Sequence, residues 1–270
     1  MRRVSGQTLC MLAWSQVWGL PKDFVPTPQT LVQHFLHTDV PVAGSVQLPP
    51  VSAVPNGTQD VLNRIQHATV YAQRSNLFSI PTDCPQRERR GWMGDAHMSS
   101  GEAILNHDME AFYSNFLDLM RDDQNIGCEV PMGEGGGSCS DAALHRGSLP
   151  DVVPFTTGPY GAFPGSTVWQ SAYPVILYNH WRHYGDLNKL QQHWPGVVAL
   201  AEYWARQPCS SSGLNRCGGL GDWVDVAWPL HTTPDDSCSA FYNALTMAYM
   251  SEMADAMGRA GEAKVALKHL

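Results

Sequence analysis

From Gln59 onward, apolar residues return at steps of three and four, which is the spacing of one face of an α-helix. The first stripe consists of Val61, Leu62, Ile65, Thr69 and Ala72. A second helix is predicted from Ala96 or Ser99 to Met120, and further helices over 168–184, 187–206, 240–257 and 261–270. Helical segments joined by long connections predict a mainly α fold for residues 58–270.

The first 57 residues have a different character. They contain seven prolines, separated by short apolar runs such as 31–36 and 46–48. Proline fixes φ and lacks a backbone donor, so this composition favours strands and turns over helices. We therefore expect a β-rich segment over residues 1–57 and a domain boundary where the helical period begins.

Residues 83–95 concentrate the chemistry of the chain. Acidic side chains at Asp83, Glu88 and Asp95 alternate with arginines, and Trp92 lies among them. Proline and glycines in the same run favour an ordered loop. Carboxylates beside guanidinium groups can have separated pKa values and an indole offers a flat apolar surface, as sugar binding and protonation of a glycosidic oxygen require. A surface turn with an arginine–acid network is the alternative interpretation.

The order of residues within this run is specific. Residues 83–89 read Asp-Cys-Pro-Gln-Arg-Glu-Arg, and residues 91–96 read Gly-Trp-Met-Gly-Asp-Ala. The run resembles the active-site signature of the α-L-rhamnosidases of glycoside hydrolase family 78. It departs from the usual pattern in having a single acid after Arg87, and Met93 where threonine is common. Later pieces follow in the family's order, namely Pro-Asp-Val-Val-Pro at 150–154, Trp-Gln-Ser-Ala at 169–172 and Gly-Asp-Trp at 221–223.

The resemblance implies an (α/α)6 toroid, the six-hairpin glycosidase-like fold. The predicted helices would supply only the N-terminal part of such a barrel, so residues 58–270 are expected to form an incomplete toroid. Residues 1–57 would correspond to the tail of a β-sandwich-like domain that precedes the catalytic domain in this family.

The resemblance also assigns roles within the run. Glu88 is expected to be the general acid, and a raised pKa would require apolar cover from Trp92 and negative charge from the neighbouring aspartates. Asp83 and Asp95 would accept hydrogen bonds from rhamnose hydroxyls, and Arg87 would orient an acid or donate to a hydroxyl. The alternatives are an ion pair between Glu88 and an arginine, a turn-forming role for Asp83, and a core position for Trp92.

Four residues from later loops are expected to join the same substrate-binding pocket. They are Asp151, Trp169, Asp222 and Trp223. Successive loops of a helical barrel converge on one mouth, which is the reason for grouping them. Helix capping by Asp222 and core positions for the two tryptophans are the ordinary alternatives. Candidate contacts to the aglycone are Asp225, Trp228, His231, Asp235 and Asp236.

The expected reaction is the removal of terminal α-L-rhamnosyl groups with inversion. Inversion requires a second carboxylate to activate water, roughly 6.5–9.5 Å from the acid. In the family this base is a glutamate much further along the chain, and no segment here resembles its surroundings, so the base is expected to be missing from these residues. An inactive rhamnose-binding or vestigial fragment, and another (α/α)6 glycosidase, are the alternative functions.

Composition limits the partners. The net charge of −8 argues against nucleic acid, and no apolar run reaches the length of a membrane span. We expect a rhamnose-containing glycoside or oligosaccharide as partner, and neither a cofactor nor a metal. Seven cysteines, with Cys128–Cys139 and Cys209–Cys217 as candidate pairs, weakly favour a secreted or otherwise oxidising location.

Overall fold

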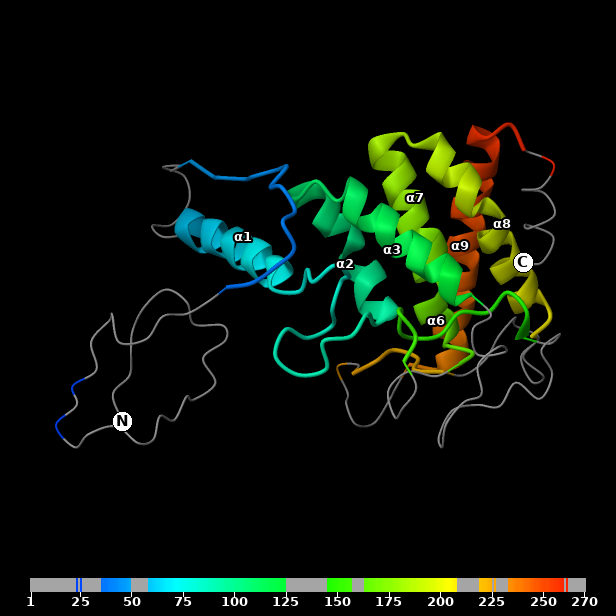
Figure 1. Ribbon diagram of the computed structural model, residues 1–270, viewed down its shortest axis with the longest axis horizontal. Helices are drawn as coiled ribbons and strands as arrows, with labels where there is room; N and C mark the ends of the chain where they lie inside the picture. Colours follow the sequence, from blue (N-terminus) through cyan, green and yellow to red (C-terminus); the bar gives the residue numbers. More distant parts are fainter. Residues whose placement is uncertain are drawn as a thin grey trace. The chain divides into compact units, whose positions relative to one another are not determined.

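A computed structural model describes residues 23, 25, 35–49, 58–124, 145–156, 163–207, 219–224, 226, 233–259 and 261. The chain divides into two units, Met1–Leu36 and His37–Leu270, and every described helix belongs to the second. These helices are α1 (Thr58–Arg74), α2 (Met93–Asn106), α3 (Glu110–Asp123), α6 (Thr167–Gln170), α7 (Ala172–Tyr184), α8 (Leu187–Ala205) and α9 (Asp235–Ala256) (Figure 1). The predicted mainly α fold is confirmed.

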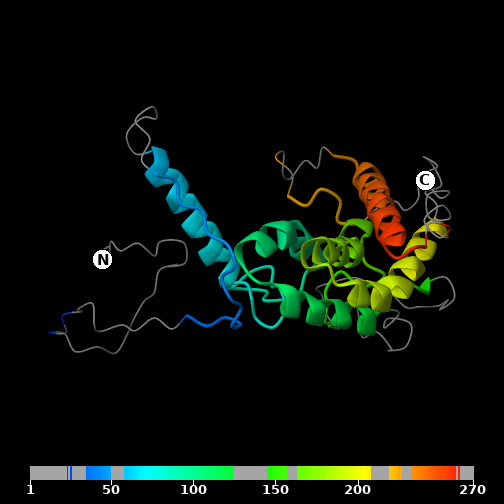
Figure 2. The same ribbon diagram turned by 90° about the horizontal axis from the view of Figure 1, so that it is seen from above.

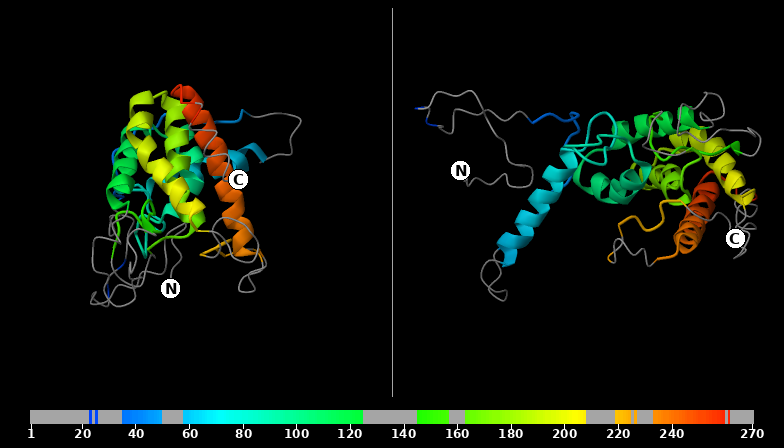
Figure 3. Two further views of the ribbon diagram at one scale, coloured as in Figure 1. Left: turned by 90° about the vertical axis from the view of Figure 1, so that its right-hand side faces the viewer. Right: turned by 90° about the horizontal axis from the view of Figure 1, so that it is seen from below.

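Helix α7 forms the centre of the packed helices. It packs against α2, α3, α8 and α9, while α3 also packs against α8, and α6 joins α2 to α9 (Figures 2 and 3). The fully buried side chains of this core include Phe116, Met120, Tyr173, Ile176, Trp194, Tyr203 and Trp204. The described helices from α2 to α9 therefore share one apolar core.

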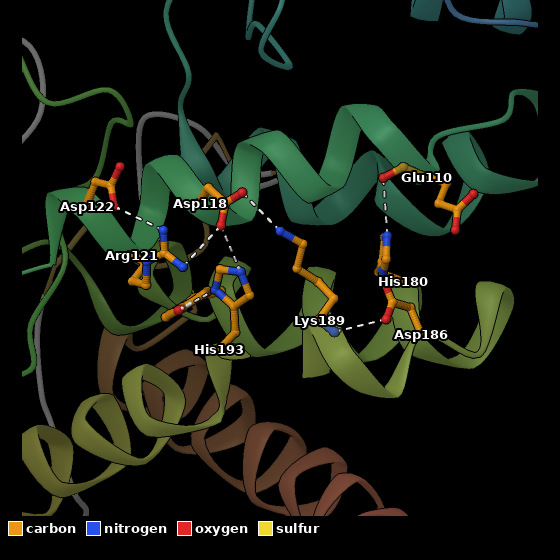
Figure 4. A network of polar contacts seen from close by, with 9 residues as sticks. Glu110, Asp118, Arg121, Asp122, His180, Asp186, Lys189 and His193 are labelled. Atoms are coloured by element: carbon orange, nitrogen blue, oxygen red, sulfur yellow. Dashed lines mark hydrogen bonds and ion pairs between the residues drawn. The ribbon is translucent and has the colours of Figure 1, made fainter. Parts of the chain in front are cut away.

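A polar network joins α3 to α7 and α8 (Figure 4). The Asp118 carboxylate accepts a hydrogen bond from Nζ of Lys189 at 2.9 Å and lies 3.2 Å from Nε2 of His193. The other ring nitrogen of His193 shares a hydrogen bond with the Tyr173 hydroxyl at 2.8 Å. Burial, and then the charges of Lys189 and Arg121, lower the pKa of His193 to about 4, so its ring is neutral inside the fold.

The predicted helix from Ala96 or Ser99 to Met120 is wrong, because α2 and α3 are separate helices. His107 ends α2 in extended backbone and pairs with Val42 in an antiparallel bridge. The backbone N–H of Met109 then donates to the Tyr184 hydroxyl at 2.7 Å. Tertiary hydrogen bonds at this corner therefore replace the helical bonds that the continuous apolar stripe predicted.

Several helix boundaries also differ from those predicted. Helix α2 begins at Met93, inside the run that was predicted to be a loop, and α9 begins at Asp235, five residues before residue 240. Gly258 has φ +72° just after the last helical residues, as expected of a C-terminal glycine. Of the predicted helix 261–270, all but Gly261 lies outside the described residues.

The predicted β-rich segment 1–57 lies largely outside the described residues, and so do both candidate cysteine pairs. Within 35–49, the chain is extended and forms the single bridge between Val42 and His107. Among the described residues, no helix combines the length and hydropathy that a membrane span requires.

Candidate active site

Residues 83–90 form a closed loop. The backbone N–H of Asp83 donates to the carbonyl of Arg90 at 3.0 Å, and the N–H of Arg90 donates to Oδ1 of Asp83 at 2.9 Å. The Arg90 side chain donates to the Thr156 hydroxyl, which ties the loop to a distant segment. Arg89 has φ +55°, a left-handed conformation that costs a non-glycine residue energy. The loop is therefore held in shape from both ends.

Residues 91–93 pair with residues 151–153. The N–H of Val153 donates to the Gly91 carbonyl at 2.9 Å, and the N–H of Met93 donates to the Asp151 carbonyl at 2.9 Å. A side chain at Gly91 is excluded, because its Cβ would lie 1.8 Å from the carbonyl oxygen of Val153. This pairing fixes the entry into α2, and with it the position of the acidic residues on either side.

Glu88 and Trp92 are in direct contact within this frame. The indole Nε1 of Trp92 donates to Oε2 of Glu88 at 2.8 Å. Nε of Arg87 lies 3.8 Å from the other oxygen of Glu88, in a pair whose arginine is largely exposed. Burial raises the pKa of the nearby Cys84 thiol. The Glu88 carboxylate is thus oriented chiefly by an indole.

Asp95 lies in the first turn of α2, close to the other two acids. Desolvation raises the pKa of its carboxyl, and the charges of Asp83 and Glu88 raise it further, against a backbone hydrogen bond that lowers it. The charges of Asp83 and Glu88 therefore act on the Asp95 carboxyl. Acceptor groups gathered in this way suit the hydroxyls of a sugar.

Asp151 and Trp169 lie beneath the first turn of α2. Asp151 is 2% exposed, and its Oδ1 accepts a hydrogen bond from the backbone N–H of Ser166 at 2.7 Å. Trp169 is 6% exposed, and a Cβ at Gly94 would lie 2.5 Å from Cε2 of its ring. The Trp169 ring packs against the first turn of α2, whereas the Asp151 carboxylate holds the backbone just before α6. The contact of either side chain with substrate stays a prediction.

Asp222 and Trp223 lie in the loop 219–224. The Asp222 carboxylate accepts from the Thr233 hydroxyl at 2.9 Å, and the backbone N–H of Leu220 donates to Oγ of Ser166 at 3.0 Å. Trp223 is 57% exposed. The hydrogen bond of Asp222 thus joins this loop to the residues just before α9. Asp225, Trp228 and His231 lie outside the described residues, while Asp235 and Asp236 begin α9.

Sequence reasoning missed the residues that hold the loop in place. Arg90 and Thr156 link two segments far apart in the chain, and Gly94 admits the Trp169 ring. The glycines were a usable signal, because glycine often marks a place where another group approaches the backbone closely. Within the described part of the chain, no three His, Cys, Asp or Glu side chains gather in a way that could hold a metal ion.

The packing of α2, α3, α7, α8 and α9 around one apolar core fits the helical class of glycosidases with an (α/α)6 toroid. Residues 55–265 match the family described as the bacterial alpha-L-rhamnosidase 6 hairpin glycosidase domain. The chain belongs to this family, and the predicted resemblance and fold class are confirmed.

Solved and curated relatives agree with this assignment. The structure of an α-L-rhamnosidase from Dictyoglumus thermophilum is 29% identical, with a TM-score of 0.70 over 92% of this chain and 24% of that one. The structure of the Streptomyces avermitilis α-L-rhamnosidase complexed with L-rhamnose is 26% identical, with a TM-score of 0.67 over 86% of this chain and 19% of that one. A curated α-L-rhamnosidase from the same organism is 28% identical over 90% of this chain and 20% of the relative's length. The chain thus spans only about a fifth to a quarter of these relatives.

Proposed function

We propose that this chain carries the acid side of an active site that removes terminal α-L-rhamnosyl groups from glycosides with inversion. The observation that carries the proposal is the Glu88 carboxylate, fixed by the Trp92 indole N–H at 2.8 Å and close to Asp83 and Asp95. Membership of the rhamnosidase family supports the substrate class.

In the proposed reaction, Glu88 donates a proton to the glycosidic oxygen as the bond to the anomeric carbon breaks. The aglycone leaves as an alcohol, and water attacks the anomeric carbon from the opposite face. A base carboxylate that takes the proton from this water would come from outside the 270 residues.

The other residues would bind the sugar. Asp95 accepts hydrogen bonds from vicinal hydroxyls, and Asp83 does so with the lone pairs that its bond to Arg90 leaves free. Arg87 is exposed enough to donate to a hydroxyl at the rim. Trp92 offers the apolar face of its ring to the sugar while its N–H holds Glu88. Asp151, Trp169, Asp222 and Trp223 remain proposed contributors to the same pocket.

Azide provides a test that needs no base, because it attacks an anomeric carbon without losing a proton. The 270-residue chain would be incubated with an aryl α-L-rhamnoside, with and without sodium azide, and products followed by NMR. We expect negligible hydrolysis without azide and formation of β-L-rhamnosyl azide with it. Tight or weak binding of L-rhamnose with no azide product would support the alternative, a binding module without turnover.

A further inference from the structure

Ser166, the residue before α6, bonds to two segments that are distant from each other in the sequence. Its backbone N–H donates to Oδ1 of Asp151 at 2.7 Å, and its Oγ accepts from the backbone N–H of Leu220 at 3.0 Å. The carbonyl of Asp151 in turn accepts from the N–H of Met93 at the start of α2, at 2.9 Å. Ser166 is 5% exposed and Asp151 is 2% exposed, so these bonds are shielded from water. Ser166 therefore joins the loop 219–224 to the segment that supports α2.

Gly219 packs directly against the same serine. A Cβ at this position would lie 2.7 Å from both Cβ and Oγ of Ser166, and the backbone has φ +115°, which favours glycine. The next residue, Leu220, donates the hydrogen bond to Oγ. Two successive residues of the loop are therefore fitted to one side chain, which has to be small and has to carry an acceptor.

The loop 219–224 lies near the face of α2 that carries Asp95, and Tyr242 of α9 connects the two. The Tyr242 hydroxyl donates to Sδ of Met98 at 3.2 Å, and Met98 follows Asp95 by three residues on α2. Residues three apart on a helix share a face. Burial raises the pKa of Tyr242, and the charge of Asp222 raises it further, so the loop carboxylate is close to this ring. A displacement of the loop would thus alter the surroundings of the carboxyl cluster.

We propose that Ser166 is a positioning residue of the active site, which holds the loop 219–224 where Asp222 and Trp223 contact the substrate. This inference rests on the proposed function, in which these two side chains belong to the sugar pocket. The Oγ of Ser166 holds the loop, whereas its backbone N–H bonds to Asp151, so a substitution separates the two roles. Loss of the hydroxyl releases the loop and leaves the proposed acid in place. The consequence is weaker substrate binding with unchanged proton transfer.

Ser166→Ala removes the acceptor of the Leu220 N–H and keeps the backbone bond to Asp151. In the azide assay on the full 270-residue chain, we expect KM for the aryl rhamnoside to rise by about five- to tenfold, which is the equilibrium effect of one hydrogen bond. The maximal rate of rhamnosyl azide formation should not change. Ser75→Ala is the matched control, because Ser75 is 4% exposed and its Oγ donates to the Ala72 carbonyl at 2.8 Å, and neither constant should change. A lower maximal rate with KM preserved in Ser166→Ala would overturn the proposal.

Amide hydrogen exchange tests the role of Ser166 without turnover. In Ser166→Ala the amides of residues 220–224 should exchange about fivefold faster or more, while those of Met93 and Val153 keep their rates. Gly219→Ala should accelerate the same amides, because it disturbs the contact from the side of the loop. No acceleration at 220–224, or an equal acceleration at Met93, would overturn the positioning role. An unmodified chain that forms no rhamnosyl azide would count against the proposed function, and the exchange rates would then decide the role of Ser166 alone.

Discussion

The indole Nε1 of Trp92 donates a hydrogen bond to Oε2 of Glu88 at 2.8 Å. Glu88 belongs to the loop that is closed between Asp83 and Arg90, and Trp92 follows this loop. The same side chain is thus both the proposed platform for the sugar and the group that orients the proposed acid. Since Trp92 is also paired through its backbone with Val152, the direction of the acid depends on a segment some sixty residues away.

Glu88→Gln should have an effect that depends on the leaving group. The variant would be tested in a chimera in which the remainder of a relative completes the site. Loss of a general acid lowers the rate by a factor on the order of 10²–10⁴ when the leaving oxygen needs a proton. Natural rhamnosides should therefore lose far more kcat/KM than a nitrophenyl rhamnoside, whereas Asp95→Asn should reduce both alike. Steady-state kinetics on the two substrates measure this, and equal losses for Glu88→Gln would remove the acid assignment.

Trp92→Phe keeps an aromatic face but removes the N–H that holds Glu88. A hydrogen bond to a charged group contributes about 1.5–3 kcal/mol, so we expect kcat to fall by roughly tenfold or more with a smaller change in KM. Trp181→Phe on α7 is the control and should change neither constant. A rise in KM with kcat preserved would instead show that Trp92 only binds sugar.

Gly94→Ala should destabilise the fold, because its Cβ would lie 2.5 Å from the Trp169 ring. Overpacking of this kind costs about 1–3 kcal/mol. Gly101→Ala is a matched control in the same helix, since no atom lies within 4 Å of its Cβ, and it should stabilise α2 by roughly 0.5–1 kcal/mol. Urea unfolding of both variants measures the two changes in the free energy of unfolding. Changes of the same sign would contradict the prediction.

Acid should weaken the fold through His193. The pKa of His193 is about 4 in the folded state and 6.5 ordinarily, so the unfolded chain takes up a proton at a higher pH than the fold does. The contribution of the neutral ring to the free energy of unfolding is therefore complete above pH 6.5 and is lost as the pH falls toward 4. Between pH 7.5 and 5.5 the loss is roughly 1 kcal/mol. His193→Gln should remove this part of the pH dependence of unfolding, while His97, whose pKa burial also lowers to about 4, keeps its own share in both proteins. An unchanged slope in the variant would show that His193 is not the titrating group.

The parts of the structure that could be predicted are those set by local sequence. Helical periodicity is local, so α1 and α8 were expected close to their observed bounds, and the helix predicted over 168–184 covers α6 and α7. The sequence also indicated that Asp83, Glu88 and Asp95 lie near one another, because proline and glycine restrict the short run that connects them.

The parts that could not be predicted depend on contacts between distant residues. The apolar stripe continues through His107, and only the bridge to Val42 shows why the helix ends there. His180 of α7 is buried with its ring 3.2 Å from the Glu110 carbonyl, a contact that no local pattern in the sequence indicates. Gly94 could mark a close approach to the backbone, but the sequence does not show that the Trp169 ring makes this approach.

The backbone pairing of residues 91–93 with 151–153 has a practical consequence for protein engineering. The two segments of this pairing lie on either side of residues 125–144 in the sequence, so a polypeptide severed there would carry the acid loop on one piece and its support on the other. Neither piece alone would orient Glu88. Recovery of rhamnose binding on mixing would then report reassembly, which makes this connection a suitable point for a split-protein sensor.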